Sequence, residues 1–309
     1  MKQYRLVLMA FVLFISACKK DNFVEDFPDE EIFDDNIDSG EEEEEGSLTL
    51  YRVNEDQIDR IKDYTVSKEL LPFQQDYAKH FKMWEFVTRL IPLAERDKIA
   101  EFEVFHGNGD LLGYVAPVDD SDLSKWRFGL AIDAAQELEV INFKDLFTYV
   151  TIHEYGHVLS LNDEQISVGD EATCNNYFTG EGCSRSDAYI NRLFELGWKD
   201  IYKELTEDNA DVIYEKYKDR FVTDYAATNP GEDFAEVFSF FVTQEEAPKG
   251  SSMADQKIRL LYEFPELVSL REQIRGNGVT LSLRAGSWLD NPLYKKFRLR
   301  SRKTCKHHH

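Results

Sequence analysis

The spacing of apolar residues changes along the chain and divides residues 47–306 into three zones. In the first zone, apolar positions recur at intervals of three and four, which is the period of a buried helix face. These positions are Ile58, Ile61, Tyr64, Tyr77, Phe81 and Trp84. We therefore predict that residues 47–98 form an N-terminal helical part.

Between Glu101 and Asp133 the period changes to two, which is typical of half-buried strands. Phe102 and Val104 precede the turn signal His106-Gly107-Asn108-Gly109, and a second alternating run extends over residues 126–132. This zone predicts a small mixed sheet. Helical periods return from Asn142, with further helices expected near 186–204, 209–221, 231–244 and 254–274. The fold class that these zones predict is α+β, rich in helices.

The helix that starts near Asn142 carries the segment His153-Glu154-Tyr155-Gly156-His157. A spacing of four places both imidazoles on one helix face, about one turn apart, where their nitrogens can bind one metal ion. A catalytic zinc site needs a third protein ligand and an open position for water. Glu154 adjoins that water and can take its proton as the water attacks a carbonyl. We therefore predict His153 and His157 as zinc ligands and Glu154 as the general base.

Gly156 lies inside this helix, although glycine costs about 1 kcal/mol relative to alanine there. Its presence indicates close approach by another element.

The third ligand cannot be the histidine of the metzincin pattern, because Ser160 and Asp163 occupy the positions where that pattern has Gly and His. Carboxylates stand just downstream, and spacing does not choose among them: Asp163, Glu164, Asp170 and Glu171.

Residues 225–236 offer a better candidate, since Asn229 can cap a helix and Pro230 suits its first position. Glu232 and Glu236 then share a face, so that one carboxylate could bind metal while the other orients a ligand imidazole. A solvated acidic helix start is the alternative.

The sequence HEYGH followed by Y-x-x-T-N-x-x-E-x-F-A-E resembles the zinc site of the anthrax lethal factor group. This resemblance implies a zincin-like fold of the gluzincin type, with Glu232 as third zinc ligand, Glu236 behind the ligands and Tyr225 as a hydroxyl donor to the oxyanion. One departure is the separation of 75 positions between His157 and Glu232, which exceeds the usual spacing and leaves room for an insertion.

That insertion contains Cys174 and Cys183, which bracket a polar, glycine-containing loop and could form a disulfide in an exported protein. No CxxC spacing favours a metal site there. His80 lies in the first helical zone and His106 in a turn, and we interpret both as structural. The strand at residues 126–132 has two interpretations: a core strand, or an edge strand that pairs with an extended peptide substrate.

The first residues predict export. Lys2 and Arg5 precede a short apolar run that ends at Ser16-Ala17-Cys18, which indicates a signal peptide over residues 1–17. Ile15-Ser16-Ala17-Cys18 resembles the bacterial lipobox, which implies a lipid on Cys18. Residues 19–46 contain fourteen Asp or Glu and two Lys, so much of the net charge of −23 lies here. We expect residues 18–46 to form a lipidated, acidic, disordered tether.

Together, the lipobox and the zinc motifs resemble the zinc metallopeptidase lipoproteins of Bacteroidetes, of the substrate import-associated zinc metallohydrolase type. The resemblance implies an outer-membrane lipoprotein on the cell surface, with the periplasmic face as the alternative, close to a nutrient-import complex.

Nucleic acid is not an expected partner, because the net negative charge opposes phosphate binding. One basic cluster lies near the C-terminus and is interpreted as a solvated tail: Lys295, Lys296, Arg298, Arg300, Arg302, Lys303 and Lys306. The terminal residues 307–309 are three histidines that look like a tag.

The sequence thus predicts a zinc peptidase whose catalytic part spans residues 99–306 and whose substrate is a peptide or protein. Two other functions stay open. One is a non-catalytic accessory lipoprotein that binds peptide or glycan for import, and the other is a zinc hydrolase of non-peptide amides.

Overall fold

In the computed structural model of this chain, residues 46–279, 288–292 and 294 are described. The predicted signal peptide, the lipid site Cys18 and nearly all of the acidic tether lie outside the described residues. So do Cys305, the basic C-terminal cluster and His307–His309.

Five strands form one sheet in the order β2-β1-β3-β5-β4. They are β1 (Ser47–Asn54), β2 (Gln57–Asp63), β3 (Ile99–Phe105), β4 (Gly113–Asp119) and β5 (Asp122–Ala131). β3 and β5 pair in parallel, and the other neighbours pair antiparallel. The predicted α+β class with a small mixed sheet is confirmed.

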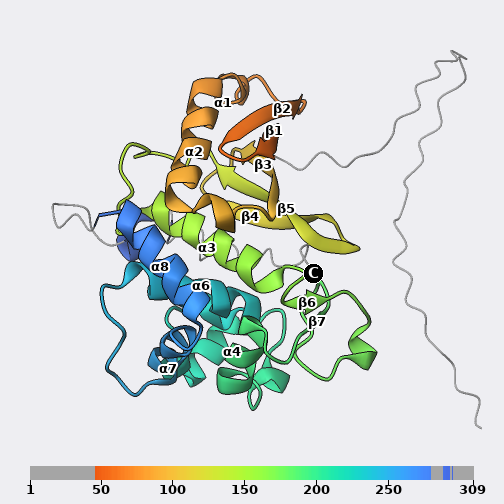
Figure 1. Cartoon of the computed structure of the whole chain (residues 1–309), viewed down its shortest axis with the longest axis vertical. Helices are drawn as coiled ribbons and strands as arrows, with labels where there is room; N and C mark the ends of the chain where they lie inside the picture. The colour runs from red at the N-terminus through yellow and green to blue at the C-terminus, as the bar shows by residue number, and fades with distance from the viewer. Residues whose placement is uncertain (1–45, 280–287, 293, 295–309) are drawn as a thin grey trace, which may run out of the picture. The chain divides into compact units, whose positions relative to one another are not determined.

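Two helices cover one face of this sheet and join it to the rest of the core. Trp84 of α2 (Tyr77–Leu90) packs on Phe102 of β3, with ring centroids 5.2 Å apart. Phe86 of the same helix packs on Phe147 of α3 (Leu146–Leu161) at 5.3 Å. Because these aromatic side chains are fully buried, they fix α3 beneath the sheet (Figure 1).

Helices α4, α6 and α7 lie on the other side of α3, so that α3 runs between the sheet and α6, whereas α1 lies beside β1 (Figure 1). The α-helices are α1 (Leu71–Gln74), α4 (Tyr189–Gly197), α5 (Ala210–Lys216), α6 (Pro230–Thr243), α7 (Met253–Leu261) and α8 (Pro265–Asn277). The short 3-10 helices are η1 (Leu93–Glu95), η2 (Glu171–Thr173), η3 (Tyr202–Glu204), η4 (Lys218–Arg220), η5 (Tyr225–Ala227) and η6 (Trp288–Asp290).

The contact between α3 and α6 explains Gly156. A Cβ atom at this position would lie 3.1 Å from the Cα atom of Ala235 and 3.3 Å from the ring of Phe238, both on α6. The predicted close approach of another element is confirmed. It allows the two helices to pack with little space between their backbones.

The prediction of helix for residues 47–64 was wrong, because this segment forms the hairpin β1–β2. The spacing of Ile58 and Ile61 suggested one helical face, but the two side chains point to opposite faces of β2. Ile58 is 5% exposed and Ile61 is 43% exposed. The helical prediction holds for α2, which contains Tyr77, Phe81 and Trp84. The predicted burial holds for Trp84, which is 2% exposed, and was wrong for Phe81, which is 50% exposed.

The helix expected over residues 254–274 is two helices, since Pro265 begins α8 after α7 has ended. Proline fits the first turn of a helix but lacks the N–H that a continuing helix would need. The segments near 186–204 and 209–221 also divide, into α4 with η3 and α5 with η4.

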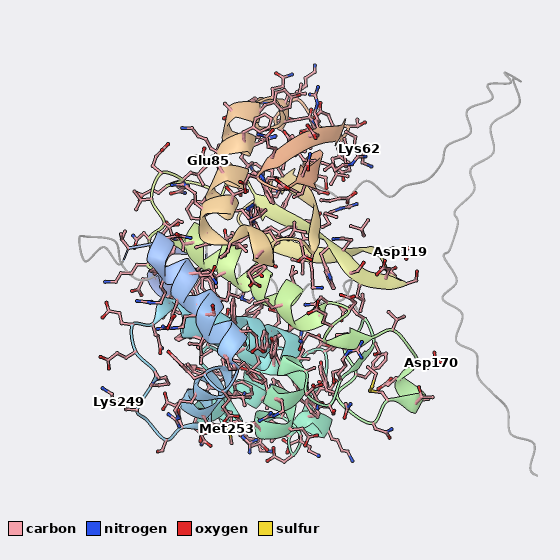
Figure 2. The ribbon with its side chains drawn as sticks, viewed as in Figure 1. Lys62, Glu85, Asp119, Asp170, Lys249 and Met253 are labelled. Carbon is pink, nitrogen blue, oxygen red and sulfur yellow. A yellow bond between two sulfur atoms is a disulfide. The ribbon has the colours of Figure 1, made fainter. Side chains whose placement is uncertain are left out.

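The interpretation of residues 126–132 as an edge strand was wrong, and the core-strand alternative is confirmed. β5 lies between β3 and β4, so it is paired on both sides. Among the described strands, β4 stands at the edge of the sheet nearest α3. Asp119 ends β4 at the tip of the β4–β5 hairpin, where its side chain is exposed (Figure 2).

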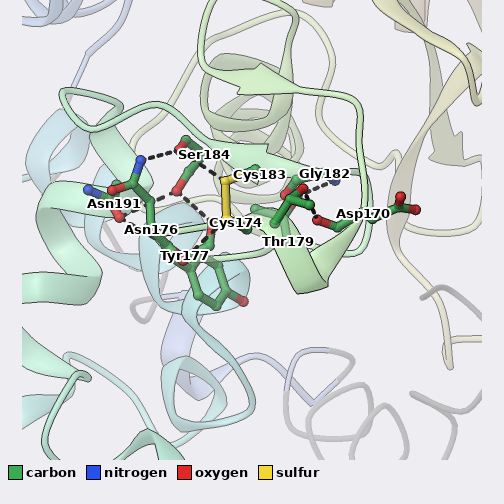
Figure 3. The surroundings of a disulfide bond; sticks show 10 residues. Asp170, Cys174, Asn176, Tyr177, Thr179, Gly182, Cys183, Ser184 and Asn191 are labelled. Atoms are coloured by element: carbon green, nitrogen blue, oxygen red, sulfur yellow. Dashed lines mark hydrogen bonds between the residues drawn. A yellow bond between two sulfur atoms is a disulfide. The ribbon is translucent and has the colours of Figure 1, made fainter.

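The insertion between the two motifs begins after α3 and contains a two-stranded sheet, β6 (Ile166–Ser167) and β7 (Cys183–Ser184). A disulfide joins Cys174 to Cys183, with Cα atoms 5.4 Å apart (Figure 3). Buried hydrogen bonds hold the same loop: Ser184 donates to the carbonyl of Tyr177, and the side chain of Asn191 accepts from the Tyr177 N–H.

Of the helices in the described part of the chain, none is long and apolar enough to cross a membrane.

Candidate metal centre

Helix α3 presents three polar side chains of the HEYGH segment from a buried helix. Asp145 caps its N-terminus by accepting hydrogen bonds from the N–H groups of Phe147 and Thr148. Two turns later, the Nε2 atoms of His153 and His157 lie 3.3 Å apart. Since a spacing of four brings side chains to the same face, the local helix alone sets this distance.

Helix α6 brings Glu232 to the two histidines. Asn229 caps α6 by accepting from the N–H of Glu232, and Pro230 is its first residue, as the sequence predicts. The Oε2 atom of Glu232 then lies 3.1 Å from Nε2 of His153 and 3.4 Å from Nε2 of His157.

The three side-chain atoms therefore form a compact triangle, and this group could hold a metal ion. Bond lengths of 2.0–2.1 Å in a tetrahedral zinc site require ligand atoms roughly 3.3 Å apart. The observed distances of 3.1, 3.3 and 3.4 Å fit this spacing. Two histidines and one carboxylate also match the protein ligands of catalytic sites that keep a fourth position open.

Glu236 lies behind His153, one helical turn after Glu232. Its Oε1 atom is 3.0 Å from Nδ1 of His153, and Oε2 accepts from the hydroxyl of Thr223 at 2.5 Å. Tyr294 contacts the same oxygen at 3.5 Å. A carboxylate on the far nitrogen fixes the ring and directs the other nitrogen toward a metal.

Glu154 is not one of the three corners of the triangle, and its side chain lies against strand β4. Its side chain is buried, and a Cβ atom added to Gly113 would lie 2.8 Å from Oε1 of Glu154. Burial is the main reason that the pKa of Glu154 rises from 4.5 to about 8. The charge of His157 lowers this pKa, and the charge of Glu232 raises it. A base with a pKa near neutrality is well matched to proton transfer at physiological pH.

His157 and Glu232 shift each other's pKa values within the triangle. Burial alone would lower the pKa of His157, but the carboxylate of Glu232 outweighs it and raises the pKa to about 9. Burial would raise the pKa of Glu232, but His157 and His153 outweigh it and hold the pKa well below its usual range. Burial lowers the pKa of His153. In the absence of metal, a proton on His157 thus balances Glu232.

Tyr225 lies on η5, immediately before the helix that carries Glu232. Its side chain is buried, and its ring lies over that of His153 with centroids 5.9 Å apart and an interplanar angle of 34°. The hydroxyl of Thr223 accepts from the N–H of Ala226 and so holds this turn in place. The resemblance to the lethal factor group assigned Tyr225 to the site, and the structure places it beside His153.

The other candidates do not join the triangle. Asp163 and Glu164 pair with Lys98 at 3.0 Å, and Asp170 and Glu171 are exposed.

The other two histidines of the described residues, His80 and His106, are not part of the triangle. Both contact aromatic side chains, as expected for structural residues. His80 is fully buried and contacts the hydroxyl of Tyr51 at 2.7 Å and the carbonyl of Phe73 at 2.9 Å. His106 packs against the ring of Phe73.

Sequence reasoning missed three contributors: Thr223, Gly113, and the buried pair Asp233 and Lys257. Asp233 follows Glu232 and receives hydrogen bonds from Lys257 and from the indole of Trp198. Burial raises the pKa of Asp233 and lowers that of Lys257. In the sequence, Asp233 looks like an ordinary acidic residue in the first turn of a helix. No local pattern shows that it is buried and paired with Lys257.

Comparisons with protein families, with curated proteins and with solved structures find no match for this chain. The function proposed for it therefore depends on the site itself.

Proposed function

We propose that this protein is a zinc-dependent peptidase whose metal ion is held by His153, His157 and Glu232. The observation that carries the proposal is the spacing of the three ligand atoms, 3.1 to 3.4 Å, together with a buried carboxyl group that is not among the ligands. That acid is Glu154. A purely structural zinc site would be closed by a fourth protein ligand and would have no use for such a base.

When bound, zinc supplies a Lewis acid that polarises a carbonyl and lowers the pKa of water. Glu154 takes the proton of the attacking water and passes it to the leaving amine. Its buried position and raised pKa suit both steps, since the group must be a base and then an acid near neutral pH. Tyr225 donates its hydroxyl to the oxyanion that forms on the carbonyl, and Glu236 keeps His153 oriented.

A peptide is the substrate that the surroundings favour. β4 is one of the two edge strands of the described sheet, and it lies against α3 beside Glu154. The carbonyl of Leu112 accepts from the N–H of Ala131, so the main-chain groups of Gly113 and Val115 are directed away from β5. An extended peptide can pair with such an edge through main-chain hydrogen bonds.

We further propose that the enzyme acts outside the cytoplasm, anchored through Cys18 to the outer membrane beside an import complex. The signal-peptide pattern and the lipobox support this location, and the disulfide is compatible with it, since such bonds persist in oxidising compartments.

The experiment that tests the proposal measures zinc content and peptide cleavage in the wild type, Glu232→Ala and Glu154→Gln. We expect about one zinc per molecule in the wild type and in Glu154→Gln, and much less in Glu232→Ala. Cleavage of a peptide library should occur with the wild type alone.

Zinc bound equally by wild type and Glu232→Ala would exclude Glu232 as a ligand. A Glu154→Gln variant that binds peptide or glycan and supports its import as well as the wild type does would favour the non-catalytic accessory lipoprotein. Cleavage of amide-bearing glycans, but not of peptides, would favour the non-peptide hydrolase.

A further inference from the structure

We propose that Gly113 of β4 is a positioning residue for Glu154: its missing side chain is the space that the carboxylate needs in order to face the metal centre. This inference rests on the proposed function, in which Glu154 is the base. Nothing in the HEYGH segment or in the helix of Glu232 indicates this residue.

The distances leave no room for a side chain at position 113. A Cβ atom built on Gly113 would lie 2.6 Å from Cγ, 2.8 Å from Oε1 and 3.0 Å from Cδ of Glu154. Carbon atoms in contact normally stay about 3.5–4.0 Å apart. Every one of these nearest atoms belongs to the side chain of Glu154, and none belongs to the backbone.

Strand β4 cannot relieve this overlap by moving away. Gly113 lies opposite Leu130 in the antiparallel pair with β5, and the neighbouring Leu112 accepts a main-chain hydrogen bond from Ala131 at 3.0 Å. β5 is in turn paired with β3. A larger residue at position 113 would therefore displace Glu154 rather than the sheet.

Backbone strain does not explain the glycine. The glycines with positive φ in the described residues are Gly46, Gly109 and Gly182, so Gly113 has a backbone conformation that alanine adopts. The three atoms nearest to the added Cβ all belong to Glu154, so we assign the requirement for glycine to this contact. Displacing a catalytic group by about 1 Å can cost roughly 100-fold in rate.

Gly129 provides a matched control on the adjacent strand. A Cβ atom there would lie 2.2 Å from the ring of Tyr114, a closer overlap than at Gly113. Gly129 and Tyr114 face the opposite side of the sheet, because side chains alternate along each strand and Gly113 faces α3. Gly129→Ala thus disturbs the same sheet without touching Glu154.

The first test compares kcat, KM and zinc content of the full-length wild type, Gly113→Ala and Gly129→Ala on a peptide that the wild type cleaves. We expect Gly113→Ala to keep one zinc, to lose roughly 100-fold in kcat and to change KM much less. Gly129→Ala should keep kcat within about threefold, even if its Tm falls. A Gly113→Ala enzyme with wild-type kcat would overturn the inference.

The second test needs no activity. Tm is measured for the wild type, Gly113→Ala, Glu154→Ala and the double variant. Gly113→Ala should lower Tm in the wild type and lower it much less when Glu154 is already alanine, since the methyl group then has space. Equal losses in both backgrounds would overturn the inference. If the wild type has no peptidase activity, the proposed function fails. The four Tm values still test the contact between Gly113 and Glu154, because they do not depend on activity.

Discussion

The Nδ1 atom of His153 lies 3.0 Å from Oε1 of Glu236, on the side of the imidazole opposite to Glu232. One histidine thus connects the two glutamates of α6, Glu232 through Nε2 and Glu236 through Nδ1. This arrangement makes the ring orientation depend on Glu236.

Glu236→Gln should therefore weaken zinc binding about 10- to 100-fold, the usual effect of removing a carboxylate behind a ligand histidine. The fold should persist, because glutamine has the same size and can still accept from Thr223. Competition with a chromogenic chelator measures the affinity, and circular dichroism checks the fold. An unchanged affinity would mean that Glu236 only fills space.

Tyr225→Phe should retain zinc and lose roughly 10²- to 10³-fold in kcat, because it removes a hydrogen-bond donor to the oxyanion. The ring of Tyr225 also packs over His153, and phenylalanine preserves that contact. Steady-state kinetics with the zinc content measured in parallel separates the two roles. Wild-type turnover by the variant would reject the assignment of Tyr225.

Glu154 should contribute less to the stability of the metal-free protein as the pH rises above about 4.5. The carboxyl of Glu154 loses its proton near pH 4.5 when unfolded and near pH 8 when folded, so the unfolded chain binds fewer protons between these values. His157 acts in the same direction: its stabilising charge is fully present below pH 6.5 and is lost as the pH rises through about 9.

Urea unfolding at pH 5 and pH 8 in the presence of a chelator measures this effect. Glu154→Gln cannot ionise, so it should show a smaller loss of stability between the two pH values than the wild type. A loss of the same size in both proteins would show that Glu154 is not protonated in the metal-free fold.

Much of the metal centre could be predicted from the sequence because its parts are local. The spacing of His153 and His157 follows from one helix, and the cap at Asn229 identifies the start of the helix that carries Glu232 and Glu236. Sequence could not show that Gly113 meets Glu154 or that Thr223 contacts Glu236, since those contacts depend on how separate elements pack. The hairpin of β1 and β2 was missed for a related reason. Ile58, Ile61 and Tyr64 are spaced like one face of a helix, but Ile61 is exposed in the structure.

Lys257→Met should destabilise the protein by about 3–5 kcal/mol, because it leaves the charge of Asp233 alone in the core. Both side chains are fully buried and bonded to each other. The double variant Lys257→Met with Asp233→Asn should recover part of the loss, since the amide can still accept from Trp198. Thermal unfolding of the wild type and the two variants tests this order of stability, and a double variant less stable than Lys257→Met would contradict it.

Replacing Cys174 and Cys183 by serine should cost about 2–3 kcal/mol, the loop-closure contribution of a disulfide that spans a short segment. The nine-residue separation is closed in addition by hydrogen bonds of Tyr177 and Ser184, so the loop should keep its position and zinc binding should persist. The wild type unfolded under reducing conditions should match the double variant. A loss of zinc on reduction would show that the loop supports the metal centre directly.

Gly156 gives the molecule a further property. The Cα atom of Ala235 lies only 3.1 Å from the space where a Cβ atom of residue 156 would stand. Of the two helices that meet here, α3 carries His153 and His157, and α6 carries Glu232. We expect a side chain at position 156 to push these helices apart by a few tenths of an ångström and to move the candidate ligands with them. A change at this contact would therefore act on the packing of the two helices and on the spacing of the three candidate ligand atoms at the same time.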